Sequence, residues 1–320
     1  MKYDSPAFCF PPSAFCFLEQ AYQAWVPYSI RLFVWRVKDA CLNPYLLALA
    51  AFLISSIFIL EKVIPARRDQ KIFSVGLFQD FVWFIFDLIF RISIVISFWG
   101  ALKVFYNRYL GFLTLHAVEA WPMAVRAIVS YVIGDFLAWF HHFARHKVKP
   151  FWFFHAIHHS QPEINVFTEA RRHVMEHIVA FSLVFIPSLI LQVNFSTIVW
   201  LPLFHEWYKH IYHANLKTNY GFLKYFMVTP QFHRIHHSME PQHQDKNFGV
   251  IFTFWDRIFG TLYKNYDEYP ETGIEDTEFP VENRGSVFVL STWLKQFLYP
   301  FQLMFREKQR VLEDLCQKPL

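Results

Sequence analysis

Residues 42–60 contain no charged side chain, and this property restricts the environments in which the segment can fold. A helix needs roughly 20 consecutive apolar residues to cross the hydrocarbon core of a bilayer. The segment, LNPYLLALAAFLISSIFIL, comes close to that length. We therefore predict that residues 42–60 span a membrane.

Three further apolar segments extend this pattern. We predict spans at residues 81–105 and 122–140, and the second of these ends directly at a cluster of histidines. The segment 178–208 is interrupted near its middle by Pro187 and Asn194, so each half is too short to cross a bilayer alone. It fits a re-entrant hairpin or two tilted half-spans, and either arrangement returns the chain to the side that it left.

The composition agrees with a membrane protein. Hydrophobic residues make up 54% of the chain and charged residues 18%, whereas soluble domains carry about 25% charged residues. The net charge of +4 is too small to indicate nucleic-acid binding. The four cysteines form no CxxC pair, so neither a disulfide framework nor a sulfur-ligated metal is expected. The predicted fold class is all-α: an integral membrane helical bundle with a cytosolic, histidine-rich helical cap at residues 209–265.

Histidine accounts for 16 of the 320 residues, and most of the histidines fall into spaced motifs. Positions i, i+3 and i+4 of a helix share one face, so an HxxHH motif presents three imidazoles to one point. At the histidine frequency of this chain, chance gives about 0.04 HxxHH motifs, yet the chain has two, together with an HxxxH pair and a lone histidine in YHAN. The nine candidate metal ligands are His142, His146, His155, His158, His159, His213, His233, His236 and His237.

Nine imidazoles exceed what one ion can accept, so the spacing predicts two metal ions. Imidazole suits Fe, Zn, Cu and Ni. Asp135 lies seven residues before His142, two turns back on the same helix face, and we expect its carboxylate to accept the outer N–H of a ligand imidazole. His142 is preferred to His141 as a ligand because His141 and His146 lie about 140° apart on a helix.

Other interpretations remain open at this point. The histidine motifs could be solvated surface residues near lipid headgroups. A membrane hydrolase with a zinc-activated water is the main alternative enzyme, although zinc sites usually keep only three protein ligands. A non-catalytic metal-binding or lipid-binding membrane protein is a third class. The sequence does not decide the roles of His173, His177 and His210.

The histidine motifs and the residues around them resemble the fatty acid hydroxylase / sterol desaturase superfamily. The resemblance runs from Gly134 to about Tyr263, through GDFLAWFHHFARH, FHAIHHS, TEARRHVME, YHANL, TPQFHRIHHS and DKNFGVIFTFWDRIFGT. Two positions depart from the family pattern: Phe143 stands where an Arg is usual, and Lys209 stands where some members carry a further histidine.

The resemblance implies a non-haem di-iron centre, with two Fe ions and O2 as the oxidant. It implies a lipid substrate that is hydroxylated or desaturated: a sterol, a fatty acyl or sphingoid chain, or an ether lipid. It also implies an external electron donor, which is a cytochrome b-type protein, a ferredoxin or a reduced pterin. In the last motif, Asp245 is expected to support the metal ligands as a second outer carboxylate beside Asp135.

The chain itself has only nine glycines and no GxGxxG motif, so a separate donor is expected to dock. Four lysines of the histidine-rich cap offer a positive surface for an acidic donor. These lysines are Lys209, Lys217, Lys224 and Lys246.

Three regions follow from these patterns. Residues 1–120 form an N-terminal membrane region with an interfacial segment at 14–37 and two spans, residues 121–265 form the fatty acid hydroxylase-like catalytic domain, and residues 266–320 form an amphipathic tail. Basic residues cluster in the loop at 61–71 and in the segment 141–177, and the positive-inside rule places both of these, with the histidines, at the cytosolic face. We expect a multi-pass protein of the endoplasmic reticulum if eukaryotic, or of the inner membrane if bacterial.

Overall fold

The computed structural model describes residues 43–194, 197, 200–281 and 289–317. The interfacial segment predicted at 14–37 lies outside these ranges. Within them, all regular secondary structure is helical, and the only β-type pairing consists of three isolated bridges. This confirms the all-α prediction.

Five of the longer helices coincide with the apolar segments. They are α3 (Pro44–Val63), α4 (Val75–Phe105), α5 (Met123–Lys147), α7 (Val174–Ile190) and α9 (Trp200–His213). Helix α7 ends at Ile190 with Leu191 as its C-cap, so the break in this apolar segment lies beyond Pro187. Pro187 is accommodated inside α7 and does not end it.

Helix α5 is long and apolar enough to cross a membrane by length and composition, and it alone qualifies among the described helices. The shorter α7 is apolar but falls below that length. Helices therefore form at all three predicted spans, whereas the expectation of several crossings is supported for α5 only. The predicted span at 122–140 is also too short, because α5 continues through the first histidines to Lys147.

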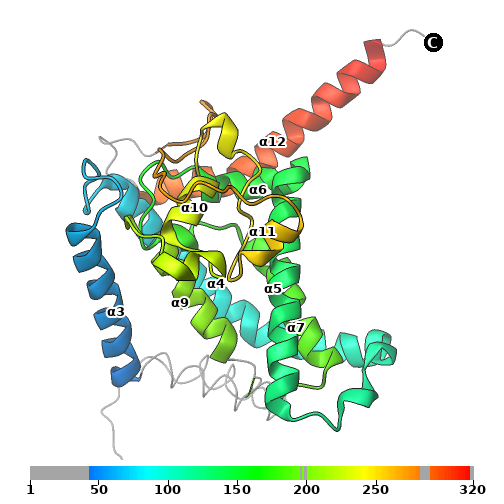
Figure 1. Cartoon of the computed structure of the whole chain (residues 1–320). Coiled ribbons are helices and arrows are strands. Elements are labelled where there is room, and N and C mark those ends of the chain that lie inside the picture. Colours follow the sequence, from blue (N-terminus) through cyan, green and yellow to red (C-terminus); the bar gives the residue numbers. More distant parts are fainter. Residues whose placement is uncertain (1–42, 195–196, 198–199, 282–288, 318–320) are drawn as a thin grey trace, which may run out of the picture.

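The polar part of the molecule gathers at one end of α5 (Figure 1). It contains α6 (Lys149–His159), α10 (Pro230–His236) and α11 (Phe254–Ile258). Short helical turns lie between the longer helices. Between α4 and α5 these are η1 (Tyr106–Leu110), η2 (Gly111–Leu113) and η3 (His116–Val118). Later in the chain, η4 (Thr168–Ala170) follows α6, η5 (Gly221–Tyr225) precedes α10 and η6 (Pro241–His243) follows it.

Helix α10 begins where its sequence provides start signals. The Thr229 side chain accepts a hydrogen bond from the Phe232 N–H, and Pro230 occupies the first turn, where a missing N–H does no harm. The helix is only seven residues long, so His237 stands at its C-cap and not within it. Capping thus fixes the register in which the second HxxHH motif faces inward.

The C-terminal helix α12 (Val289–Gln317) packs against the bundle through its first half. The Trp293 ring lies 5.5 Å from Trp83 of α4, and Gln296 accepts a 2.9 Å hydrogen bond from the Trp83 indole. One face of the helix leaves Leu294 and Phe305 exposed. Helix α12 lies within the region predicted as an amphipathic tail, residues 266–320. Its first half belongs to the core packing of α4 (Figure 1).

A buried polar hub on α4 holds the chain that follows α6. The Asp80 carboxylate is fully buried and forms an ion pair with Arg171 at 2.9 Å. It also accepts hydrogen bonds from the side chains of Gln161, Asn165 and Thr168. Arg171 in turn donates to the carbonyl of Ile157 within α6. The hub therefore anchors the C-terminal end of α6, where His158 and His159 lie.

We predict that Asp80→Ala destabilises the protein strongly, because the substitution leaves the Arg171 guanidinium buried without its counter-charge. Removing one partner of a buried ion pair typically costs about 3–5 kcal/mol. The measurement is thermal unfolding of the purified protein in detergent. Asp69→Ala is the control, since Asp69 pairs with Arg67 at the surface; an equal loss of Tm in both variants would contradict the role of the hub.

Candidate metal centre

Four helices bring the nine predicted histidines into one buried volume. Helix α5 supplies two of them, α6 three, α9 one, and α10 with its C-cap three. The structure divides them into two groups, and within each group the candidate ligand atoms all lie within 4.8 Å of one another. The five-histidine group is His142, His146, His155, His159 and His236, and the four-histidine group is His158, His213, His233 and His237.

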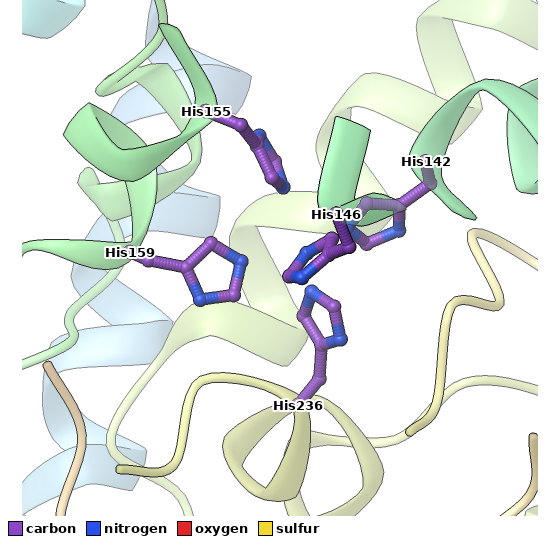
Figure 2. Close-up of side chains that lie close together, drawn as sticks. All are labelled: His142, His146, His155, His159 and His236. Atoms are coloured by element: carbon purple, nitrogen blue, oxygen red, sulfur yellow. The ribbon is translucent and has the colours of Figure 1, made fainter. Parts of the chain in front are cut away.

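In the five-histidine group the rings point toward one common centre (Figure 2). The ring centroids of His142 and His236 are 4.3 Å apart, and those of His146 and His159 are 4.7 Å apart. The Nε2 atoms of all five residues are buried and have no hydrogen-bond partner. Five buried polar atoms without partners are costly unless a ligand satisfies them, so the geometry fits a bound cation.

The four-histidine group is more crowded. The Nε2 atom of His213 lies 3.2 Å from Nε2 of His158 and 2.7 Å from Nε2 of His233. The Nε2 atom of His233 also lies 3.0 Å from Nε2 of His237. Each neutral imidazole has a single N–H group and can donate only one hydrogen bond. That bond can link only one of these pairs of nitrogens. A shared cation accounts for the convergence of all four nitrogens.

The outer nitrogens of several rings are fixed by backbone carbonyls. The Nδ1 of His142 donates to Phe248 at 2.9 Å, that of His236 donates to Lys246 at 2.9 Å, and that of His213 donates to Lys209 at 2.7 Å. Donation from Nδ1 leaves the lone pair on Nε2, which faces the centre of each group. The tautomers are therefore arranged for metal ligation before any metal binds.

Burial also keeps the imidazoles neutral. It lowers the pKa of His236 to about 3 and that of His213 to about 4. For His158, His159 and His233, burial first and the neighbouring histidines second lower the pKa well below its usual value. Only the neutral form of an imidazole can donate its lone pair, so both groups are competent at neutral pH.

One buried carboxylate supports each group. Glu176 of α7 lies 3.2 Å from Nδ1 of His155 and also pairs with Arg145. Glu169 of η4 lies 3.4 Å from Nδ1 of His213. Glu169 also lies 2.5 Å from Arg172. A carboxylate behind an imidazole raises its basicity and orients the ring.

The prediction for Asp135 was wrong. Its carboxylate accepts hydrogen bonds from the backbone N–H of Ile251 at 3.0 Å and the indole of Trp255 at 2.9 Å. Seven residues along a helix correspond to about 10 Å, which is beyond the reach of an aspartate toward the ring of His142. Asp135 instead anchors the segment that carries the Phe248 carbonyl, so its connection to His142 is indirect.

Asp256 completes the fold of that segment. Its carboxylate accepts hydrogen bonds from the N–H groups of Phe248 and Gly249 at 2.8 and 2.7 Å. A Cβ at Gly249 would lie 2.9 Å from the carbonyl oxygen of Phe252, so only glycine fits the bend. The two carboxylates together place the Phe248 carbonyl opposite His142.

Asp245 does not support an imidazole either. It lies at the surface with a positive φ of 60° and forms a 2.5 Å ion pair with Lys147. The backbone at this position turns the Asp245 side chain toward the surface. Lys209, expected on a positive docking surface, is buried and pairs with Glu169 at 2.9 Å.

The three undecided histidines have other partners. His173 caps α7 by accepting the Met175 N–H, His177 pairs with Asp87 at 2.5 Å, and His210 donates to the Val166 carbonyl at 2.6 Å. None of the three belongs to either histidine group.

Comparison with known proteins gives a consistent result. The family model for fatty acid hydroxylase matches residues 127–261, which contain all nine histidines. The ornithine lipid hydroxylase OlsE of Rhizobium tropici is 28% identical over 145 residues, covering 45% of this chain and 44% of that protein. The alkylglycerol monooxygenase of Homo sapiens is 33% identical over 124 residues, covering 39% and 27%.

The very-long-chain aldehyde decarbonylase GL1-4 of Oryza sativa subsp. japonica is 28% identical over 189 residues, covering 55% of this chain and 30% of that protein. The chain therefore spans less than half of the length of each of these three relatives. No solved structure matches the chain.

We predict that Glu176→Gln lowers the affinity of the five-histidine group for metal. Loss of an outer-shell partner typically reduces affinity or activity by about 10–100-fold. Competition with a chelator measures the effect. Glu119→Gln is the matched control, because Glu119 is an exposed residue that pairs with His116. Unchanged metal retention in Glu176→Gln would show that His155 needs no carboxylate support.

Proposed function

The chain belongs to the fatty acid hydroxylase superfamily, and on this premise we propose that it is a membrane-bound, non-haem di-iron enzyme that uses dioxygen to oxidise a lipid. The observation that carries the proposal is the pair of buried histidine groups, in which all five Nε2 atoms of one group lack a partner. Such a donor set has no evident purpose without cations.

Two iron ions fit the residues better than one zinc ion. Catalytic zinc sites usually have three protein ligands and one open position, whereas this chain supplies five imidazoles to one position and four to the other. The five-histidine group would hold one iron and the four-histidine group the second. When bound, the pair of irons would supply the activation of dioxygen that an unactivated C–H bond requires.

The residues of the chain contribute orientation and charge. Backbone carbonyls hold His142, His213 and His236 in one tautomer. Nine neutral ligands leave the charge of two cations uncompensated, and Glu169 and Glu176 place negative charge directly behind two of the rings. Burial of most of the imidazoles limits the contact of both groups with bulk water, which strengthens these interactions.

Hydroxylation of a C–H bond balances as one lipid, one O2, two electrons and two protons, giving the alcohol and one water. The two electrons must come from outside the histidine site. We propose a separate donor, which is a cytochrome b-type protein, a ferredoxin or a reduced pterin. The surface lysines Lys217 and Lys246 remain candidates for docking an acidic protein, whereas the buried Lys209 does not.

Hydroxylation is favoured over desaturation by the names of two relatives, a lipid hydroxylase and a monooxygenase. The two names give an ornithine lipid and an alkylglycerol as the compounds acted on, so we propose a lipid substrate for this chain. We further propose a multi-pass arrangement in which α3 and α4 join α5 in the bilayer, with the histidines at the cytosolic face. Both α3 and α4 have exposed apolar side chains, such as Phe52 on α3 and Ile89 on α4, as expected for helices in contact with lipid.

The source of the inserted oxygen atom tests this function. We predict that purified, iron-loaded protein with total membrane lipid, a reductant and isotope-labelled dioxygen yields a lipid that carries the label. Without reductant, the protein should complete at most one turnover. His236→Ala should yield no labelled product, whereas His116→Ala, an exposed histidine outside both groups, should behave as wild type.

No label from dioxygen, together with incorporation of oxygen from isotope-labelled water in a parallel reaction, would contradict the proposal and indicate a hydrolase. Unlabelled lipid with two hydrogens fewer, accompanied by labelled water, would identify a desaturase within the same class of chemistry. Sustained turnover without reductant would exclude an oxygenase.

A further inference from the structure

A cavity of about 590 Å³ adjoins the five-histidine group. Its walls come from α6, the segment after α10, residues 273–276 and Leu303 of α12. Its volume lies in the range of about 300–1,000 Å³ that is usual for small-molecule sites. Residues far apart in the sequence therefore combine to form one space beside the candidate metal centre.

The inner end of the cavity reaches the histidines. His146, His159 and His236 line it, and no member of the four-histidine group does. The side chains of His159 and His236 are buried, and their Nε2 atoms have no hydrogen-bond partner. The cavity thus leads to one of the two candidate metal positions.

The walls between the histidines and the mouth are largely apolar. They include Trp152, Phe153, Met239 and Leu303. A hydrocarbon chain gains roughly 0.8 kcal/mol for each methylene that it buries against such walls. The walls therefore suit an alkyl chain that ends near the imidazoles.

The mouth is acidic. Lys149 lines it but forms a 2.7 Å ion pair with Glu307, and Asp245 forms a 2.5 Å pair with Lys147. Two more lining carboxylates, Glu275 and Asp276, have no basic partner within 4 Å among the residues that the structure describes. Asp276 accepts hydrogen bonds from the Tyr299 hydroxyl at 2.8 Å and from the Glu278 N–H at 3.0 Å, whereas Glu275 is exposed.

We propose that this cavity binds the substrate lipid, and that Glu275 and Asp276 select a headgroup carrying a positively charged amine. The alkyl chain lies along the apolar walls toward His159 and His236, and the ammonium group lies at the mouth. This inference rests on the proposed function, because it names the class of lipid that the same site oxidises.

Binding of three single-chain amphiphiles tests the proposal independently of turnover. Hexadecylamine, hexadecanol and hexadecanoate have the same chain length and differ in headgroup charge. Their affinities are measured by equilibrium dialysis against the full chain in uncharged detergent, at low and at high salt. We predict that wild type prefers hexadecylamine and that salt weakens this preference, because salt screens exposed charges.

The double variant Glu275→Gln/Asp276→Asn should weaken hexadecylamine about fivefold and leave hexadecanol nearly unchanged, as expected for loss of two partly exposed ion pairs. Glu275→Gln alone gives the same direction and leaves the Tyr299 contact intact. Ala156→Phe fills the cavity and should weaken all three amphiphiles. Glu278→Gln, on the same segment but outside the cavity, is the matched control.

Equal affinity for the amine and the alcohol in wild type would overturn the headgroup assignment. So would a preference that survives the double variant, and unchanged binding in Ala156→Phe would exclude the cavity itself. A charge-selective, Glu275-dependent site in a protein that oxidises no lipid would leave the cavity assignment standing and reject the proposed function. The experiment therefore distinguishes failure of the cavity assignment from failure of the proposed function.

Discussion

The structure depends on the burial of nine imidazoles whose lone pairs face inward. An unsatisfied buried polar group costs about 1–3 kcal/mol, so the five partnerless Nε2 atoms of the five-histidine group would strongly destabilise a fold of ordinary stability. Cations that accept these lone pairs remove the penalty and turn it into binding energy. The rest of the molecule can be understood as the scaffold that holds the imidazoles in this arrangement.

The scaffold orients several of the rings through the nitrogen that faces away from the candidate metal position. The carbonyls of Phe248 and Lys246 receive N–H groups from His142 and His236, and Glu176 stands behind His155. The Phe248 carbonyl is held by backbone contacts of its own segment with carboxylates on α5 and α11. Farther out, Asp80 of α4 holds the chain after α6, although α4 lies outside the segment that matches the family. The N-terminal helices thus take part in shaping the site.

The histidine pattern could be predicted because helical periodicity is local: residues three and four apart share a face whatever surrounds them. The all-α class followed from apolar segments in the same way. The outer support could not be predicted, since it depends on contacts between distant parts of the chain. Asp135 shares a helix face with His142 but lies too far along the axis. Glu169 supports His213 from across the fold, and no spacing rule connects these two residues.

The central claim is that the two histidine groups are two separate metal positions, and metal content per chain tests it most directly. Iron should be measured in purified wild-type protein and in His233→Ala and His236→Ala, which each alter one group. The account predicts two iron ions per chain in wild type and about one in each variant, bound by nitrogen ligands without sulfur in X-ray absorption. One zinc ion in wild type, or two ions retained in both variants, would contradict it.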